Sequence, residues 1–161
     1  MNFSVIISLF NEELNISKLV DEIFSVLKKK KFNFEIVLVN DFSADQTQIV
    51  IEYLSQKYQN KIKVINNSKN LGQSLSILNG IKSSSFETIV TLDGDGQNNP
   101  IDIPILLNKY ISDKEIKLVG GIRLNRKDSI IKRYSSIIAN SIRKFILDDD
   151  CTDTGCSLKV F

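Results

Sequence analysis

The sequence contains no histidine, no tryptophan and only two cysteines in 161 residues. Without histidine, this chain has no imidazole for acid–base catalysis and lacks the residue type that most zinc sites use. The two cysteines, Cys151 and Cys156, are too few for a disulfide framework. No base lies near Cys156 in the sequence, so we expect a small buried residue there and not a nucleophile. Any chemistry of the chain must therefore come from carboxylates, amides and basic side chains.

Long hydrophobic runs are also missing. No apolar stretch approaches the roughly 18 residues that a membrane helix needs, and no basic leader with an apolar region opens the chain, so we expect no signal peptide and a cytoplasmic protein. The formal net charge of +2 is too small to indicate a nucleic-acid partner. An apolar content of 42% and a charged content of 25% are typical of one globular domain with a sizeable core.

Two common phosphate-binding motifs are absent as well. No Gly-x-Gly-x-x-Gly follows the first predicted strand, and Gly-Lys-Ser/Thr does not occur. Neither a Rossmann dinucleotide grip nor a P-loop is therefore supported. If the protein binds a nucleotide, its phosphates must be held by a metal ion, by arginines and by helix ends.

What the sequence does contain is a regular alternation of strand-like and helix-like segments. Buried strands are predicted at residues 3–9, 34–39, 62–65, 89–93, 116–119 and 157–161. Helices are predicted at residues 16–27, 49–58, 73–82, 101–110 and 129–147. Four successive strand–helix units predict an α/β fold with a mainly parallel, Rossmann-like sheet and helices on both faces.

The segment Asp93-Gly94-Asp95 directly follows the fourth predicted strand. In open α/β sheets, ligands bind at the carboxyl ends of the strands. Two carboxylates this close repel each other unless a cation or a shared proton lies between them. Oxygen ligands suit Mg²⁺ or Mn²⁺, and Mg²⁺ is often held by one or two carboxylates together with substrate phosphates. The alternative is a solvated Asp/Gly turn without a ligand.

Six segments, in the same order along the chain, resemble the motifs of family 2 glycosyltransferases. Residues 37–47 are similar to the family's Val-Asp-Asp-Gly-Ser-x-Asp-x-Thr signature, and residues 91–100 to the Leu-Asp-Ala-Asp-Leu-Gln-x-x-Pro of its polyprenyl-phosphate branch. The other four are residues 5–13, residues 70–73 with Gly80, residues 121–129, and residues 153–159. The nearest relatives by this resemblance are dolichyl-phosphate mannose synthase-like and undecaprenyl-phosphate sugar transferases.

This resemblance implies a GT-A type nucleotide-diphospho-sugar transferase fold and a single catalytic domain over residues 1–161. It further implies an inverting transfer of sugar from a UDP- or GDP-sugar to a dolichyl or undecaprenyl phosphate, assisted by Mg²⁺ or Mn²⁺. Two alternatives stay open. One is a family 2 transferase with a saccharide acceptor, and the other is a nucleotide-sugar-binding chain without turnover.

The resemblance also implies which residues form the site. The metal ligands would be Asp93, Asp95 and Gln97. Contacts to the donor nucleotide are expected from Phe10, Glu12, Asn40, Asp41, Asn70, Gln73, Asp93 and Gly94. The catalytic groups would be Asp153, Arg123 and Arg126, the arginines because a guanidinium matches a phosphate with its planar fork of donors. The structural alternatives are a turn aspartate and a solvated pair of arginines.

The chain departs from the family at two positions and in its length. Asn40 stands where the family has its first acid, and Phe42 where it has glycine, which puts base selection in question. Family members also continue further, often into membrane helices, so we expect a domain truncated at its C-terminus. The full-length protein would then lie at the cytoplasmic face of a membrane. An uncovered apolar stripe on helix 129–147 would favour self-association or membrane adhesion of this chain.

Overall fold

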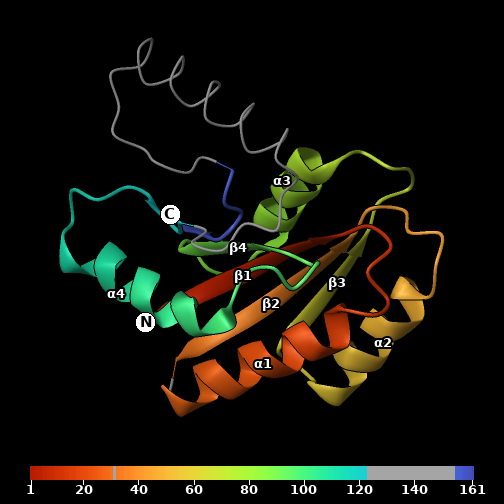
Figure 1. Ribbon diagram of the computed structural model, residues 1–161, viewed down its shortest axis with the longest axis horizontal. Coiled ribbons are helices and arrows are strands. Elements are labelled where there is room, and N and C mark those ends of the chain that lie inside the picture. The colour runs from red at the N-terminus through yellow and green to blue at the C-terminus, as the bar shows by residue number, and fades with distance from the viewer. Residues whose placement is uncertain (31, 123–154) are drawn as a thin grey trace, which may run out of the picture.

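The computed structural model describes residues 1–30, 32–122 and 155–161. Within these residues, one six-stranded sheet has the strand order β3-β2-β1-β4-β6-β5 (Figure 1). Four neighbouring strands run parallel, and β6 runs antiparallel to both of its neighbours, β4 and β5. The strands are β1 (Asn2–Leu9), β2 (Asn33–Asn40), β3 (Ile62–Asn66), β4 (Ile89–Asp93), β5 (Val119–Gly120) and β6 (Lys159–Val160). The predicted mainly parallel sheet is confirmed.

Helices cover both faces of this sheet, as predicted (Figure 1). One face packs on α1, α2 and α4, which share a single large hydrophobic cluster with β1, β2 and β4. The opposite face packs on α3, in a smaller cluster. The helices are α1 (Ile16–Lys29), α2 (Thr47–Lys57), α3 (Gln73–Ser83) and α4 (Ile103–Ser112), with a 3₁₀ turn η1 (Pro100–Asp102) before α4. None of the helices in the described ranges has the length and apolar character needed to cross a bilayer.

The sequence of the central strand β1 is almost uninterruptedly apolar because this strand is buried on both faces of the sheet. Successive side chains of a strand point to opposite faces. Phe3, Val5 and Ile7 therefore enter the larger cluster, and Ile6 enters the smaller one beneath α3. A strand that is buried on both faces needs an apolar residue at nearly every position, which is typical of parallel sheets with helices on both sides.

The last two strands are shorter than predicted. The apolar residues 116–119 predicted a full strand, but β5 contains only Val119–Gly120, because the backbone N–H of Ile116 closes a turn on the carbonyl of Asp113 (3.2 Å). Of the predicted strand at 157–161, only Lys159–Val160 forms β6. The predicted helix at 129–147 lies outside the described residues.

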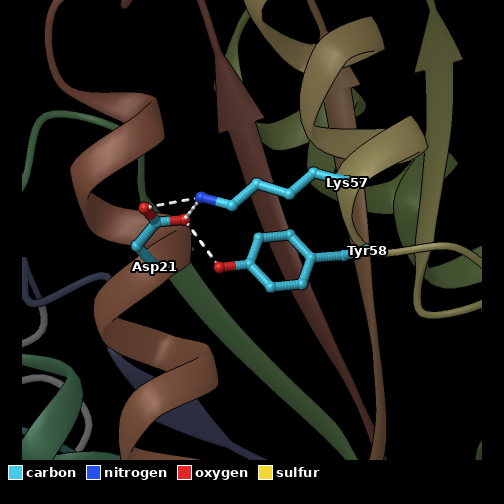
Figure 2. Close-up of polar contacts among 3 residues, drawn as sticks. All are labelled: Asp21, Lys57 and Tyr58. Carbon is cyan, nitrogen blue, oxygen red and sulfur yellow. Dashed lines mark hydrogen bonds and ion pairs between the residues drawn. The ribbon is translucent and has the colours of Figure 1, made fainter.

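A polar contact and an aromatic stack join α1 to α2 and the residue that follows it (Figure 2). Asp21 accepts hydrogen bonds from Lys57 Nζ (2.8 Å) and from the hydroxyl of Tyr58 (2.7 Å), and the ring of Tyr58 stacks on Phe24. Burial acts to raise the pKa of Asp21, but the bonds from Lys57 and Tyr58 outweigh it and lower that pKa. Because these groups are partly exposed, the ion pair contributes little stability by itself.

Helix α3 approaches the sheet closely at Gly80, which is buried. A methyl group at this position would collide with Cγ2 of Ile6 and would lie 3.1 Å from Cγ2 of Val39. The glycine therefore allows the helix to lie directly on β1 and β2. Since α3 begins at Gln73, this contact also fixes the position of a predicted site residue.

We predict that Gly80→Ala lowers the melting temperature. Overpacking of a core costs about 1–3 kcal/mol, which exceeds the gain of about 1 kcal/mol in helix propensity. Ser74→Ala on the same helix is the control, because Ser74 is exposed. Thermal denaturation followed by circular dichroism measures both variants, and a Gly80→Ala protein as stable as the parent would contradict the close approach.

Candidate functional site

The parallel register brings the ends of four strands to one edge of the sheet. Leu9 of β1 lies opposite Asn40 of β2, and Ser8 lies opposite Asp93 of β4. Asn40 is in turn aligned with Asn66 of β3. The polar loops that follow these strands therefore converge, although they are far apart in the sequence. This is the edge at which open α/β sheets bind ligands.

A pocket of about 270 Å³ opens at this edge. It is formed by the loops after β1, β2 and β4 and by the first residue of α3. Its lining residues are Ser8, Leu9, Phe10, Glu12, Asp41, Gln73, Asp93, Gly94 and Asp95. The structure thus brings together seven residues that the sequence proposed for the nucleotide or the metal, and adds Ser8 and Leu9 as the wall formed by β1.

Hydrogen bonds join the loop after β1 to the loop after β2. The backbone N–H of Asn11 donates to Ser43 Oγ (3.0 Å), and the N–H of Ala44 donates to Asn11 Oδ1 (2.8 Å). The N–H of Glu13 donates to Asp45 Oδ2 (3.2 Å). In each of these bonds, a backbone N–H group of one loop donates to a side-chain oxygen of the other loop. The two loops are therefore held as one unit beside the pocket.

Asp41 is the central buried charge of the site, with only 3% of its surface exposed. It accepts hydrogen bonds from the backbone N–H groups of Leu71 and Gly72 and from Nδ2 of Asn67, each at 2.8 Å. Burial acts to raise the pKa of Asp41, but these donors outweigh it and hold the pKa below its usual value. The ionised carboxylate therefore fixes the loop that leads into Gln73.

The carboxylates of Asp93 and Asp95 are held in different ways. Gln73 Nε2 donates to Oδ1 of Asp93 in a short hydrogen bond, which connects the start of α3 to the end of β4. Asp95 accepts the backbone N–H of Gln97 through Oδ1 (3.0 Å), an arrangement within its own turn. Both carboxylates line the pocket. The structure therefore presents two acidic groups on the same wall.

Gly94, which separates these two carboxylates, lies close to the loop after β1. A methyl group at this position would collide with Cδ2 of Leu9 and would lie 3.3 Å from Cγ of Glu12. The loop after β4 can thus lie directly against the loop after β1. Gly94 and Glu12 both line the pocket, on two loops that approach each other here.

Three of the proposed residues do not line the pocket. Both ends of the Asn40 amide are used within the chain, since Nδ2 donates to Gln48 Oε1 (2.8 Å) and Oδ1 accepts the N–H of Ser43 (3.1 Å). Asn40 is also only 6% exposed. Asn70 is exposed and accepts the N–H of Gly72, and the side chain of Gln97 is exposed. In the structure, Asn40 stabilises the turn after β2 and Asn70 the turn before α3.

The proposed catalytic residues Arg123, Arg126 and Asp153 lie outside the described residues. Residues 155–157, which follow Asp153 closely, are described and lie beside β4. Asn98 Nδ2 donates to Ser157 Oγ (2.7 Å), and Thr91 Oγ1 donates to the Ser157 carbonyl (2.6 Å). Residues 155–157 are therefore held against the loop that carries Asp95.

Sequence reasoning missed two buried asparagines, Asn67 and Asn98. Asn67 joins Asp41 to Ser76 through Nδ2 (2.8 and 2.9 Å), and Asn98 also accepts a hydrogen bond from the buried thiol of Cys156. Both follow a strand at the ligand-binding edge, which was the available signal. The prediction that Cys156 is a small buried residue is confirmed.

A comparison of the sequence with models of known protein families identifies the family of this chain. The model of the family described as glycosyl transferase family 2 matches residues 4–161. The chain belongs to glycosyl transferase family 2. The resemblance carried by the six sequence segments is therefore confirmed over nearly the whole chain.

Curated members of this family that resemble the chain are polyprenyl-phosphate enzymes by name. A dodecaprenyl-phosphate galacturonate synthase of Rhizobium johnstonii is 30% identical over 162 residues, covering 100% of this chain and 48% of the relative. An undecaprenyl-phosphate 4-deoxy-4-formamido-L-arabinose transferase of Pseudomonas fluorescens is 30% identical over 158 residues, covering 98% and 46%. The chain thus spans about half the length of the curated relatives that it matches.

Solved structures of other sugar transferases share the fold. Glucosyl-3-phosphoglycerate synthase of Mycobacterium tuberculosis, solved with UDP, has a TM-score of 0.75 and 16% identity, covering 99% of this chain and 56% of that chain. A mannosyltransferase of Pyrobaculum calidifontis, solved with GDP-Man and Mn²⁺, has a TM-score of 0.63 and 18% identity, covering 74% and 35%. The chain has the expected GT-A type of fold.

The carboxylates of the pocket fit a divalent ion that is shared with a ligand. In the part of the chain that the structure describes, no three His, Cys, Asp or Glu side chains gather into a group that could hold a metal by itself. Asp93 and Asp95 are two oxygen donors on one wall. Mg²⁺ commonly takes one or two carboxylates and completes its shell with substrate phosphates and water. The donor set therefore suits an ion that binds together with a diphosphate.

We predict that Asp41→Asn destabilises the protein by about 1–3 kcal/mol at neutral pH, because an amide turns an NH₂ group toward buried N–H donors. The folded pKa of Asp41 is lowered from 3.8, so the carboxylate stabilises the fold above that pH. This stabilisation is lost as the pH falls through the folded pKa. Urea denaturation at pH 7 and across the acid range measures the difference between parent and variant.

The control for this experiment is Asp113→Asn, since Asp113 is exposed and accepts the N–H of Glu115 within its own turn. That variant should have the stability of the parent at pH 7. An Asp41→Asn protein with the stability of the parent at pH 7 would show that the buried carboxylate does not hold the loop.

Proposed function

We propose that this protein transfers a sugar from a nucleotide-diphosphate donor to a polyprenyl phosphate. The observation that carries this proposal is the pocket at the carboxyl edge of the sheet, in which Asp41, Gln73, Asp93 and Asp95 converge from separate loops. Support for a polyprenyl phosphate acceptor comes from the relatives at 30% identity, which are named for dodecaprenyl and undecaprenyl phosphate.

The pocket residues have separate roles in this proposal. Asp95 and Asp93 would hold Mg²⁺ or Mn²⁺, which would supply neutralisation of the negative charge that develops on the diphosphate leaving group. Gln73 orients Asp93 through its amide hydrogen bond. Phe10, Glu12 and Asp41 lie at the loops after β1 and β2, where they face the nucleoside.

The transfer itself requires little proton abstraction, since an acceptor phosphate is largely ionised near neutral pH. One of its oxygens attacks the anomeric carbon opposite the diphosphate. A new carbon–oxygen bond forms as the bond to the diphosphate oxygen breaks, and the nucleoside diphosphate leaves with the electron pair, which inverts the anomeric configuration. We assign Arg123 and Arg126 to the phosphates and Asp153 to orienting the acceptor. In this scheme residues 1–161 form the catalytic domain.

A lipid acceptor places this reaction at a membrane surface, and the expected location remains its cytoplasmic face. The second candidate function is binding of the nucleotide sugar without turnover. The observation that favours it is the pocket itself, because its lining, among the described residues, includes residues proposed for the nucleotide and the metal but none of those proposed for catalysis.

A transfer assay separates these functions. The protein is incubated in detergent with undecaprenyl phosphate, Mn²⁺ and a panel of radiolabelled UDP- and GDP-sugars, and label is measured in the organic extract. We expect label in the lipid fraction that requires both the lipid and the ion. Nucleotide binding without transfer would favour the binding function, and transfer to a soluble saccharide in place of the lipid would overturn the assigned acceptor.

We predict that Asp95→Asn weakens binding of UDP and GDP in the presence of Mn²⁺ by roughly tenfold or more, because the phosphate charges lose their bridge to the protein. Asparagine keeps an oxygen that can accept the N–H of Gln97, so the turn is preserved. Titration calorimetry with and without EDTA measures the effect, with Asp113→Asn as the control. Equal affinities in parent and variant under both conditions would exclude Asp95 from the metal site.

A further inference from the structure

Phe42 is an unusual residue at an unusual backbone position. Its side chain is 58% exposed, and its φ of 61° lies in the left-handed region. Bulky residues rarely adopt this region, whereas glycine enters it without steric cost. Phe42 therefore combines an exposed phenyl ring with a strained backbone, and strained residues of this kind are concentrated at functional sites.

Phe42 is next to the pocket along the chain, although it is not among the residues that line it. It directly follows Asp41, which lines the pocket wall. The next residue, Ser43, is hydrogen-bonded to Asn11, and the residue before Asn11 is the pocket residue Phe10, which is 49% exposed. Two exposed aromatic residues thus stand on two loops that are bonded to each other beside the same pocket.

The exposed ring of Phe42 is neither packed in the hydrophobic core nor well placed to insert into a lipid bilayer. Phe42 does not contribute to the core, because it belongs to neither cluster of buried side chains. Insertion into an anionic bilayer is opposed by the carboxylates of Glu12, Glu13 and Asp45 on the same pair of loops. The pocket lined by Phe10 and by Asp41, the neighbour of Phe42, offers a planar ligand as a partner for the ring.

We propose that Phe42 stacks on the base of the donor nucleotide and supplies affinity for the base through its ring face. This inference rests on the proposed function. Asn40 has both ends of its amide engaged within the chain, so it does not read the base by hydrogen bonds in this arrangement. Stacking recognises the π-face that every base presents. The ligand class is therefore a nucleoside diphosphate with either a pyrimidine or a purine base.

The test compares Phe42→Gly and Phe42→Asn with the parent in calorimetric titrations of UDP, GDP and inorganic pyrophosphate, all with Mn²⁺. Glycine and asparagine both tolerate a left-handed backbone, so the loop is expected to fold in each variant. We expect affinity for UDP and GDP to fall by about tenfold, which is the scale of one base–aromatic stack. Affinity for pyrophosphate should stay unchanged, and Phe42→Gly should melt at the same temperature as the parent or higher.

Two further variants sharpen the result. Phe42→Tyr keeps the ring and should retain the affinity of the parent for both nucleotides. Tyr53→Ala removes an aromatic ring that is also 58% exposed but belongs to α2, which contributes no residue to the pocket, and it should change none of the titrations.

The outcomes separate this inference from the function on which it rests. Parent-like binding of UDP and GDP by Phe42→Gly would overturn stacking and leave the proposed function intact. An equal loss of pyrophosphate affinity would also overturn it, since the residue would then act on the phosphate half of the site. If the parent itself binds pyrophosphate but neither nucleotide, both the inference and the proposed function are wrong.

Discussion

The buried carboxylate of Asp41 is the interaction on which the arrangement of the site depends. It follows the end of β2 and gathers two backbone N–H groups and one side-chain amide from the loop after β3. A loop of irregular backbone needs partners for its N–H groups, and here a single ionised residue satisfies two of them. Removing the charge would leave buried donors without an acceptor. The start of α3, and with it Gln73, is positioned by this one residue.

From this anchor the site extends in two directions. Gln73 connects the start of α3 to Asp93 on β4, and the close approach at Gly94 brings that loop against β1. In addition, hydrogen bonds from backbone N–H groups of the loop after β1 to side-chain oxygens of the loop after β2 hold these two loops together. Four loops from distant parts of the chain thus support one small pocket before any ligand arrives. Such preorganisation lowers the cost of binding a charged, flexible ligand.

Some features of the site are shared with glycosyl transferase family 2, and others are particular to this chain. The acidic pair after β4 and the buried Asp41 agree with the family resemblance. Asn40 and Phe42 depart from it, and the structure gives each departure a physical meaning. Asn40 stabilises the turn with both ends of its amide. Phe42 has a left-handed backbone conformation, and its ring is exposed to solvent.

The sequence by itself determined the first four strands, the helices α1 to α4 and the acidic edge. Apolar periodicity and turn residues act over short distances, so β1, α1 and the Asp93–Asp95 turn could be predicted from local pattern alone. Local pattern failed at residues 116–119, where a turn at Ile116 interrupts a strand-like run. That run lies at the edge of the sheet, where β5 pairs only with β6 among the described strands, so there is little pairing to enforce a longer strand.

Only the tertiary structure decided which polar residues face the pocket. In the sequence, Asn40 and Asp41 are neighbouring polar residues after the same strand, and both were proposed to contact the nucleotide. The backbone partner of Asp41 at Leu71 lies 30 residues away, and the strand register that brings them together is a property of the whole sheet. Hydrogen-bond satisfaction then directs Asn40 inward to its own turn and leaves Asp41 on the pocket wall, because buried polar groups must find partners wherever the fold places them.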